Sequence, residues 1–335
     1  MSEPRSSRNR TLSLTPAEKQ ALRASLPAVQ GPLQPEDICD RIFCADTLSA
    51  IDHFPAQCVD LLILDPPYNL DKDFQGSKFK HQSDADYLAY LESWFPRMLR
   101  LLKEHASVYL CGDWRCCAAM YTVMSRHLLV RNRITWQREK GRGARRNWKN
   151  CSEDIWFGTL GQEYYFAVDA VMQKRKVLAP YRQDGQPKDW QESAEGNFRL
   201  SHPANFWDDL TVPYWSMPEN TDHPTQKPEK LLAKLILASS RPGDLVFDPF
   251  LGSGTSAVVA KKLGRHYSGL EINPEYCCWA LQRLQRAEQD KSIQGYCQGV
   301  FWERNTRSQQ KKRPPQTPPR TSCRSSTPRG HNGTP

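Results

Sequence analysis

The sequence contains no apolar run close to the roughly 18 residues that a membrane-spanning helix requires. The first five residues are polar, and no apolar segment of a secretory signal follows them. No internal repeat is present either. We therefore expect a cytoplasmic protein that has no membrane partner.

Cysteine spacing argues against both disulfides and zinc. The 11 cysteines are odd in number, and no Cys-x-x-Cys pair occurs, although adjacent pairs stand at 116–117 and 277–278. Without a paired spacing, we expect reduced, mostly buried thiols and no metal centre.

Positive charge is concentrated at the two ends of the chain. Lysine and arginine total 46 against 37 acidic residues, a net charge of +9. Residues 1–35 carry +3 and residues 303–335 carry +7, which leaves −1 between them. The last segment is rich in Pro, Ser, Thr and Arg, a composition that predicts a disordered tail.

A carboxylate follows the first strongly apolar segment. Val59–Leu64 predicts a buried strand, which ends at Asp65-Pro66-Pro67-Tyr68. Ligands bind at the carboxyl ends of strands in open α/β sheets. Asp65 and the Pro66 carbonyl can accept hydrogen bonds from an amine on a flat base, and Tyr68 can stack on that base. An ordinary strand-ending turn is the alternative.

A second strand-turn-helix pattern lies near residue 250. Leu245–Asp248 predicts a strand, Pro249–Thr255 a turn and residues 256–263 a helix, and the next strand closes with Glu271. The turn glycines permit close backbone approach, and Glu271 is placed to bind ribose hydroxyls. Because the full Gly-x-Gly-x-x-Gly spacing is missing, a nucleoside without phosphates, such as S-adenosylmethionine, fits better than a dinucleotide. A plain βαβ unit is the alternative.

In this order, the two motifs resemble those of the β-class, circularly permuted amino-DNA methyltransferases, which act on N6 of adenine or N4 of cytosine. The resemblance covers about residues 38–290 and is weak between 159 and 204. It implies an α/β fold of the class I, Rossmann-like type. That fold has a mostly parallel seven-stranded sheet with helices on both faces and a target-recognition insert.

The resemblance and the composition divide the chain into five parts. They are a polar N-terminal extension (1–35), a catalytic half (36–158), a target-recognition insert (159–222), a cofactor-binding half (223–302) and a disordered basic tail (303–335).

The resemblance also assigns the site. It gives the catalytic role to Asp65, Pro66, Pro67 and Tyr68, and places Glu153–Phe157 beside the target pocket. It implies S-adenosylmethionine as cofactor, held by Asp46, Asp65, His223, Thr225, Lys227, Asp248, Phe250, Gly252, Ser253, Gly254, Thr255 and Glu271.

A basic segment follows the strand predicted at 128–137. Its cations are Arg138, Lys140, Arg142, Arg145, Arg146 and Lys149, separated by two glycines and flanked by tryptophans. Such a composition suits a phosphate backbone and an exposed base, and a solvated loop is the alternative. We expect the tail to add DNA affinity without selecting the sequence.

The first hypothesis is therefore N6 methylation of adenine in double-stranded DNA by base flipping. Cytosine N4 stays open, because the same geometry serves both amines, although Asp65 favours adenine since the resembling cytosine enzymes more often carry serine. The absence of a Pro-Cys dipeptide argues against C5-cytosine methylation. The motif order disfavours RNA and protein targets, and the intact motifs disfavour a non-catalytic DNA-binding subunit. A cognate restriction endonuclease and a second copy in a homodimer are further candidate partners.

Overall fold

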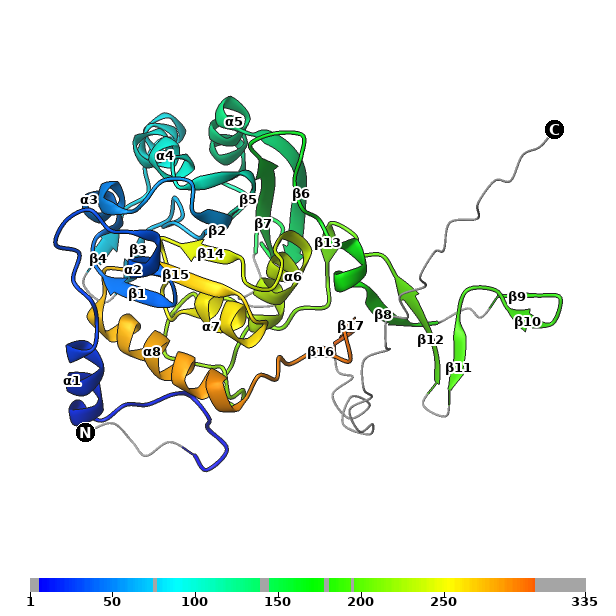
Figure 1. The fold of residues 1–335 in the computed structure, drawn as a ribbon. Helices are drawn as coiled ribbons and strands as arrows, with labels where there is room; N and C mark the ends of the chain where they lie inside the picture. The colour runs from blue at the N-terminus through cyan, green and yellow to red at the C-terminus, as the bar shows by residue number, and fades with distance from the viewer. Residues whose placement is uncertain (1–5, 75–76, 139–144, 178–180, 194–195, 305–335) are drawn as a thin grey trace, which may run out of the picture.

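The computed structural model describes residues 6–74, 77–138, 145–177, 181–193 and 196–304. Its centre is a sheet in the order β1-β15-β14-β2-β5-β7-β6-β13 (Figure 1). The strands are β1 (Arg41–Cys44), β2 (Val59–Leu64), β5 (Leu102–Gly112), β6 (Leu129–Gln137), β7 (Ser152–Thr159), β13 (Phe206–Trp207), β14 (Leu245–Asp248) and β15 (His266–Glu271). Only β7 runs against its neighbours in this sheet, which confirms the mostly parallel arrangement. The sheet has eight strands rather than the expected seven, because the two-residue β13 adds to its edge beside β6.

The strand order is permuted relative to the sequence. Late strands β14 and β15 lie between the early strands β1 and β2. All four run in parallel, so their carboxyl ends meet at one edge of the sheet. Strand β6 has the same direction as β5, because both are antiparallel to β7, and it therefore ends at that edge too.

Each face of the sheet has its own apolar core. Along β2, Leu61 and Ile63 belong to one core and Leu62 and Leu64 to the other, as the alternation of side chains along a strand requires. One face is covered by α3 (Thr47–Ala50), α4 (Asp84–Leu99) and α5 (Cys117–His127). The opposite face is covered by α6 (Glu229–Ser239), α7 (Thr255–Lys262) and α8 (Pro274–Gln289) (Figure 1).

A second sheet extends away from the main one (Figure 1). Its order is β11-β12-β8-β17-β16, from β8 (Gln173–Lys176), β11 (Gln191–Ser193), β12 (Gly196–Ser201), β16 (Tyr296–Cys297) and β17 (Val300–Trp302). The predicted recognition insert thus shares a sheet with a segment that follows α8. Short pairs and turns complete the fold: β3 (Lys72–Phe74), β4 (Ser77–Phe79), β9 (Arg182–Gln183), β10 (Gln186–Pro187), η1 (Ile51–His53) and η2 (Val168–Val171).

The N-terminal segment packs against the domain. Helix α1 (Pro16–Ala24) begins after Thr15, which caps it in a capping box with Glu18. Leu12 is buried with Tyr276 and Trp279 of α8. The short α2 (Pro35–Ile38) then leads into β1. The predicted disorder of the tail concerns residues that lie, after 304, outside the described part of the chain.

Candidate active site

A cavity of about 300 Å³ opens at the carboxyl ends of β1, β2, β14 and β15. This is the edge where the sequence placed both motifs. All the predicted catalytic and cofactor residues line the cavity except Gly254: Asp46, Asp65, Pro66, Pro67, Tyr68, His223, Thr225, Lys227, Asp248, Phe250, Gly252, Ser253, Thr255 and Glu271. Residues that the sequence did not single out, including Thr47, Tyr90, Leu251 and Tyr276, also line it.

Two acidic residues frame the side of the cavity near β1 and β15. Asp46 caps α3 by accepting a hydrogen bond from the Ser49 backbone N–H, at 3.0 Å. Glu271 closes β15 and accepts from the backbone N–H groups of Gly252 and Asn273, each at 2.7 Å. Burial raises the pKa of Glu271 above its ordinary value. Each carboxylate keeps unused lone pairs that a bound polyol could reach.

The two turn glycines have different surroundings. Both adopt positive φ, 56° at Gly252 and 80° at Gly254. A Cβ atom at Gly252 would lie 3.0 Å from Nε2 of His223, a residue of the cavity wall. At Gly254 it would lie 2.5 Å from Cβ and 2.9 Å from Cα of Ala280 in α8. Gly254 therefore lets the start of α7 approach α8 closely, and its assignment to the cofactor wall stays a prediction.

The predicted catalytic carboxylate is held by a lysine from far along the sequence. Lys227 Nζ lies 2.8 and 2.7 Å from the two oxygens of Asp65 and 2.9 Å from the Tyr68 hydroxyl. That hydroxyl also lies 2.9 Å from Asp65 Oδ1. Burial lowers the pKa of Lys227, but the charges of Asp65 and Glu153 outweigh burial, so the pKa lies above its ordinary value. Lys227 is therefore a cation at any working pH.

Glu153, which the resemblance placed beside the target pocket without a role of its own, is a further member of this group. It lies at the start of β7, and its Oε2 is 3.2 Å from the Tyr68 hydroxyl and 3.5 Å from Lys227 Nζ. Its other oxygen, Oε1, accepts from Arg138, the first cation of the basic segment. Burial, followed by the charges of Asp65 and Glu153, raises the pKa of Tyr68 well above its ordinary value, so the phenol stays protonated.

The remaining motif carboxylate, Asp248, is buried beneath the turn. It accepts from the Phe250 backbone N–H at 2.9 Å and from the Ser256 hydroxyl at 2.6 Å. Burial raises the pKa of Asp248 to about 7. Asp248 therefore fixes the turn between β14 and α7, in addition to lining the cavity.

The basic segment is only partly described, since Lys140 and Arg142 lie outside the described residues. Arg138 is paired with Glu153, whereas Arg145, Arg146 and Lys149 are exposed. Of the flanking tryptophans, Trp136 is buried in the core and Trp148 is 97% exposed. Within the insert, Trp207 is buried in the core, whereas Tyr214 and Trp215 lie on an irregular surface segment and are 44% and 50% exposed.

The permuted, mostly parallel sheet with helices on both faces, and the Asp-Pro-Pro-Tyr strand end beside a cavity, match the class I methyltransferase fold that the sequence predicts. The family N6_N4_Mtase, described as DNA methylase, matches residues 59–282, and the chain belongs to this family. Membership confirms the predicted family and enzyme class, a DNA methyltransferase that uses S-adenosylmethionine.

Curated relatives agree with this assignment. The type II methyltransferase M.HpaI of Haemophilus parainfluenzae is 33% identical over 247 residues, which cover 73% of this chain and 74% of the relative. The DNA adenine methyltransferase YhdJ of Escherichia coli (strain K12) is 34% identical over 251 residues, which cover 72% and 82%.

Solved structures share the fold at low sequence identity. The PvuII DNA methyltransferase (cytosine-N4-specific) has a TM-score of 0.55 at 16% identity, covering 74% of this chain and 90% of that one. The DNA modification methylase TTHA0409 from Thermus thermophilus, complexed with S-adenosyl-L-methionine, has a TM-score of 0.51 at 18% identity, covering 78% and 97%. Within the described ranges, no helix combines the length and apolarity that crossing a bilayer needs.

Proposed function

We propose that this enzyme transfers a methyl group from S-adenosylmethionine to the exocyclic N6 of adenine in double-stranded DNA. The observation that carries the proposal is the position of Asp65 and Pro66, which border the cofactor cavity at the carboxyl end of β2. An exocyclic amine placed there would have hydrogen-bond acceptors on one side and the methyl donor on the other.

Asp65 has one hydrogen-bond acceptor position left for an N–H of the amine. A carboxylate offers about four lone-pair positions. Lys227 and Tyr68 occupy two on Oδ1, and Lys227 occupies one on Oδ2. One position on Oδ2 is left for an N–H, and the Pro66 carbonyl supplies an acceptor for the second.

These two acceptors would draw the amine toward a tetrahedral geometry, in which its lone pair no longer conjugates with the ring. The negative charge of Asp65 would stabilise the positive charge that develops on nitrogen. Lys227 and Arg138 are balanced by Asp65 and Glu153, so the site carries no excess positive charge that would repel the nitrogen.

The cavity fits a nucleoside-type cofactor. Asp46 and Glu271 provide carboxylates for polar groups of the adenosine part, and Gly252 leaves its backbone accessible near His223. His223, Thr225 and Ser253 also line the cavity and offer polar groups to the same cofactor. When bound, S-adenosylmethionine supplies an electrophilic methyl group.

DNA would approach along the edge where β6 ends. Arg145, Arg146 and Lys149 are exposed there and are suited to phosphate contacts, which position a duplex without reading its sequence. The target base must leave the stack to reach Asp65.

Adenine as the target base is supported by the relative YhdJ, named a DNA adenine methyltransferase, and by aspartate rather than serine at position 65. The name type II methyltransferase among the relatives supports a companion restriction endonuclease; a homodimer is a further proposal, which light scattering tests.

The test is methylation of duplex DNA with labelled S-adenosylmethionine, followed by digestion and mass spectrometry of the nucleosides. We expect N6-methyladenine in the wild type and a yield lower by about 10²–10³ in Asp65→Ala at equal reaction time. N4-methylcytosine would replace the adenine assignment with the cytosine one. Label in neither base, in a protein that binds the cofactor, would overturn the proposal.

A further inference from the structure

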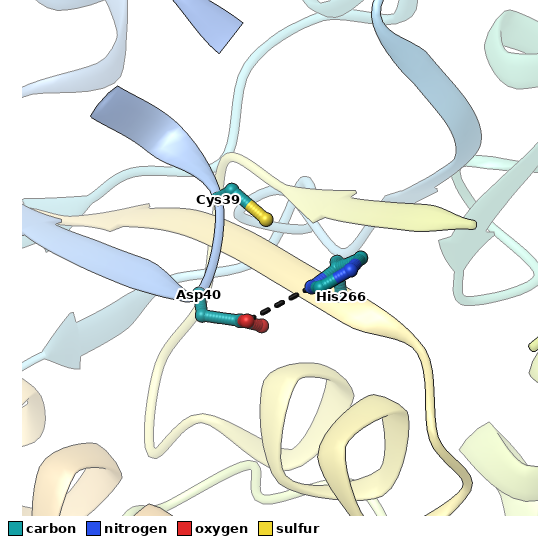
Figure 2. A group of neighbouring side chains, drawn as sticks. All are labelled: Cys39, Asp40 and His266. Carbon is teal, nitrogen blue, oxygen red and sulfur yellow. Dashed lines mark hydrogen bonds and ion pairs between the residues drawn. The ribbon is translucent and has the colours of Figure 1, made fainter. Parts of the chain in front are cut away.

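Three potential metal ligands converge at the edge of the main sheet opposite the cofactor cavity (Figure 2). Cys39 and Asp40 directly precede β1, and His266 is the first residue of β15. Because β1 and β15 pair in parallel, the starts of the two strands lie side by side. A thiol sulfur, a carboxylate oxygen and a ring nitrogen thus lie within 4.8 Å of one another, the only such group among the described residues.

The backbone at Asp40 allows the convergence. Neighbouring side chains of an extended chain point to opposite sides, but Asp40 has a φ of 57°, in the left-handed region. That conformation is strained for a residue with a Cβ atom. Local bonds hold it: Asp40 Oδ2 lies 2.8 Å from His266 Nδ1, and Oδ1 accepts from the Tyr267 backbone N–H at 3.3 Å. Cys39 and Asp40 can therefore both face His266.

The donor set selects the ion. Thiolate, imidazole and carboxylate together suit Zn²⁺, whereas Mg²⁺ and Ca²⁺ prefer oxygen ligands alone. Three protein ligands leave one tetrahedral position for water, and Asp40 and His266 are about half exposed, so an ion can enter from solvent.

We propose that Cys39, Asp40 and His266 form a binding site for Zn²⁺ that ties the start of β1 to the start of β15. The ligands come from positions 226 residues apart, which is why the cysteine spacing predicted no metal centre. The site is separate from the chemistry, because the opposite ends of the same strands lead to Asp46 and Glu271 in the cofactor cavity. Its role is to stabilise this edge of the sheet.

The test uses the full-length protein, treated with a chelator and titrated with Co²⁺ as a spectroscopic substitute for Zn²⁺. We expect one equivalent to bind with a thiolate-to-cobalt charge-transfer band, which Zn²⁺ abolishes by displacement. Cys39→Ser should remove the band, and Asp40→Asn and His266→Ala should each weaken binding at least tenfold. Circular dichroism and cofactor binding establish that each variant is folded.

Two matched controls isolate the site. His105 lies 3.4 Å from Asp60 in another surface pair, so His105→Ala should leave the titration unchanged. Cys151 is an exposed free thiol, and Cys151→Ser should keep the band. Zn²⁺ should raise the melting temperature of the wild type and of both controls but not of Cys39→Ser. A band that persists in Cys39→Ser, no uptake of either ion, or an equal thermal response in wild type and Cys39→Ser would overturn the proposal.

Discussion

The two turn glycines allow a sharp test of the site, because a third glycine provides a baseline. Gly252, Gly254 and Gly264 all have positive φ, of 56°, 80° and 74°. An alanine at Gly264 would meet nothing within 4 Å, so its only cost is backbone strain. We expect Gly264→Ala to lower the free energy of unfolding by about 1–2 kcal/mol and to leave cofactor affinity unchanged.

Gly254→Ala adds a steric conflict with backbone atoms. The new Cβ would lie 2.9 Å from Cα of Ala280, so α8 must shift. Overpacking of this kind costs about 1–3 kcal/mol, for a total loss of roughly 2–5 kcal/mol. At Gly252 the new Cβ would lie 3.0 Å from the His223 ring. The ring can move at a small cost in stability, but its movement would change the shape of the cavity wall.

We therefore expect Gly252→Ala to be about as stable as Gly264→Ala and to lose cofactor affinity, with Gly254→Ala the least stable of the three. Denaturant unfolding measures the stabilities, and calorimetry with S-adenosylmethionine measures the affinities. If Gly252→Ala bound the cofactor as Gly264→Ala does, the wall around His223 would not contact the cofactor. Equal stability of Gly254→Ala and Gly264→Ala would refute the packing argument.

Three further predictions concern chemistry, pH and DNA. Asp65→Ala should keep cofactor affinity and lower the methylation rate by about 10²–10³, as loss of a transition-state contact does; a loss below about tenfold would remove Asp65 from catalysis. Because the pKa of Asp248 is raised to about 7, the folded state holds a proton that the unfolded state releases near pH 4, so stability should fall as pH rises between these values. Asp248→Asn should flatten this dependence in pH-resolved denaturation, and an unchanged slope would contradict it. Replacing Arg145 and Arg146 with Ala should lower the slope of log DNA affinity against log salt concentration by roughly 2. Replacing the exposed pair Arg286 and Lys291 with Ala is the control and should leave this slope unchanged. Equal slopes in the two double variants would mean that the basic segment has no role in DNA binding.

The parts of the fold that the sequence predicted are those fixed by local pattern. The run before Asp65 is apolar at nearly every position and stops at two prolines, so both the strand and its end were visible. Contacts between distant segments were not. Lys227 reaches Asp65 across 162 residues, and Glu153 reaches Tyr68 across 85. The spacing of these residues in the sequence does not show that they are in contact, because the contacts form only once the strands are paired in the sheet.

Other misses had signals that were weaker than the competing patterns. Helix α8 was not predicted, although Asn273 caps it and Pro274 occupies its first turn, a typical helix start. The different neighbours of the two turn glycines could not be predicted either. Gly252 and Gly254 look equivalent in the motif, and only the folded structure shows that one faces His223 and the other Ala280. The edge strand β13 consists of two residues, too few for any periodicity.

Ion pairs around Asp65 join the segment expected to bind DNA to the segment expected to bind the cofactor. Asp65 and Glu153 share Lys227, and Glu153 also pairs with Arg138, so a partly buried and a buried carboxylate are balanced by two cations. Removing one member would leave an uncompensated charge, which is costly in a buried site. Arg138 directly follows β6 and begins the basic segment, while Lys227 belongs to the segment that precedes α6 and lines the cavity. The proposed catalytic carboxylate is therefore held between the element expected to meet DNA and the element expected to meet the cofactor, and its position depends on both.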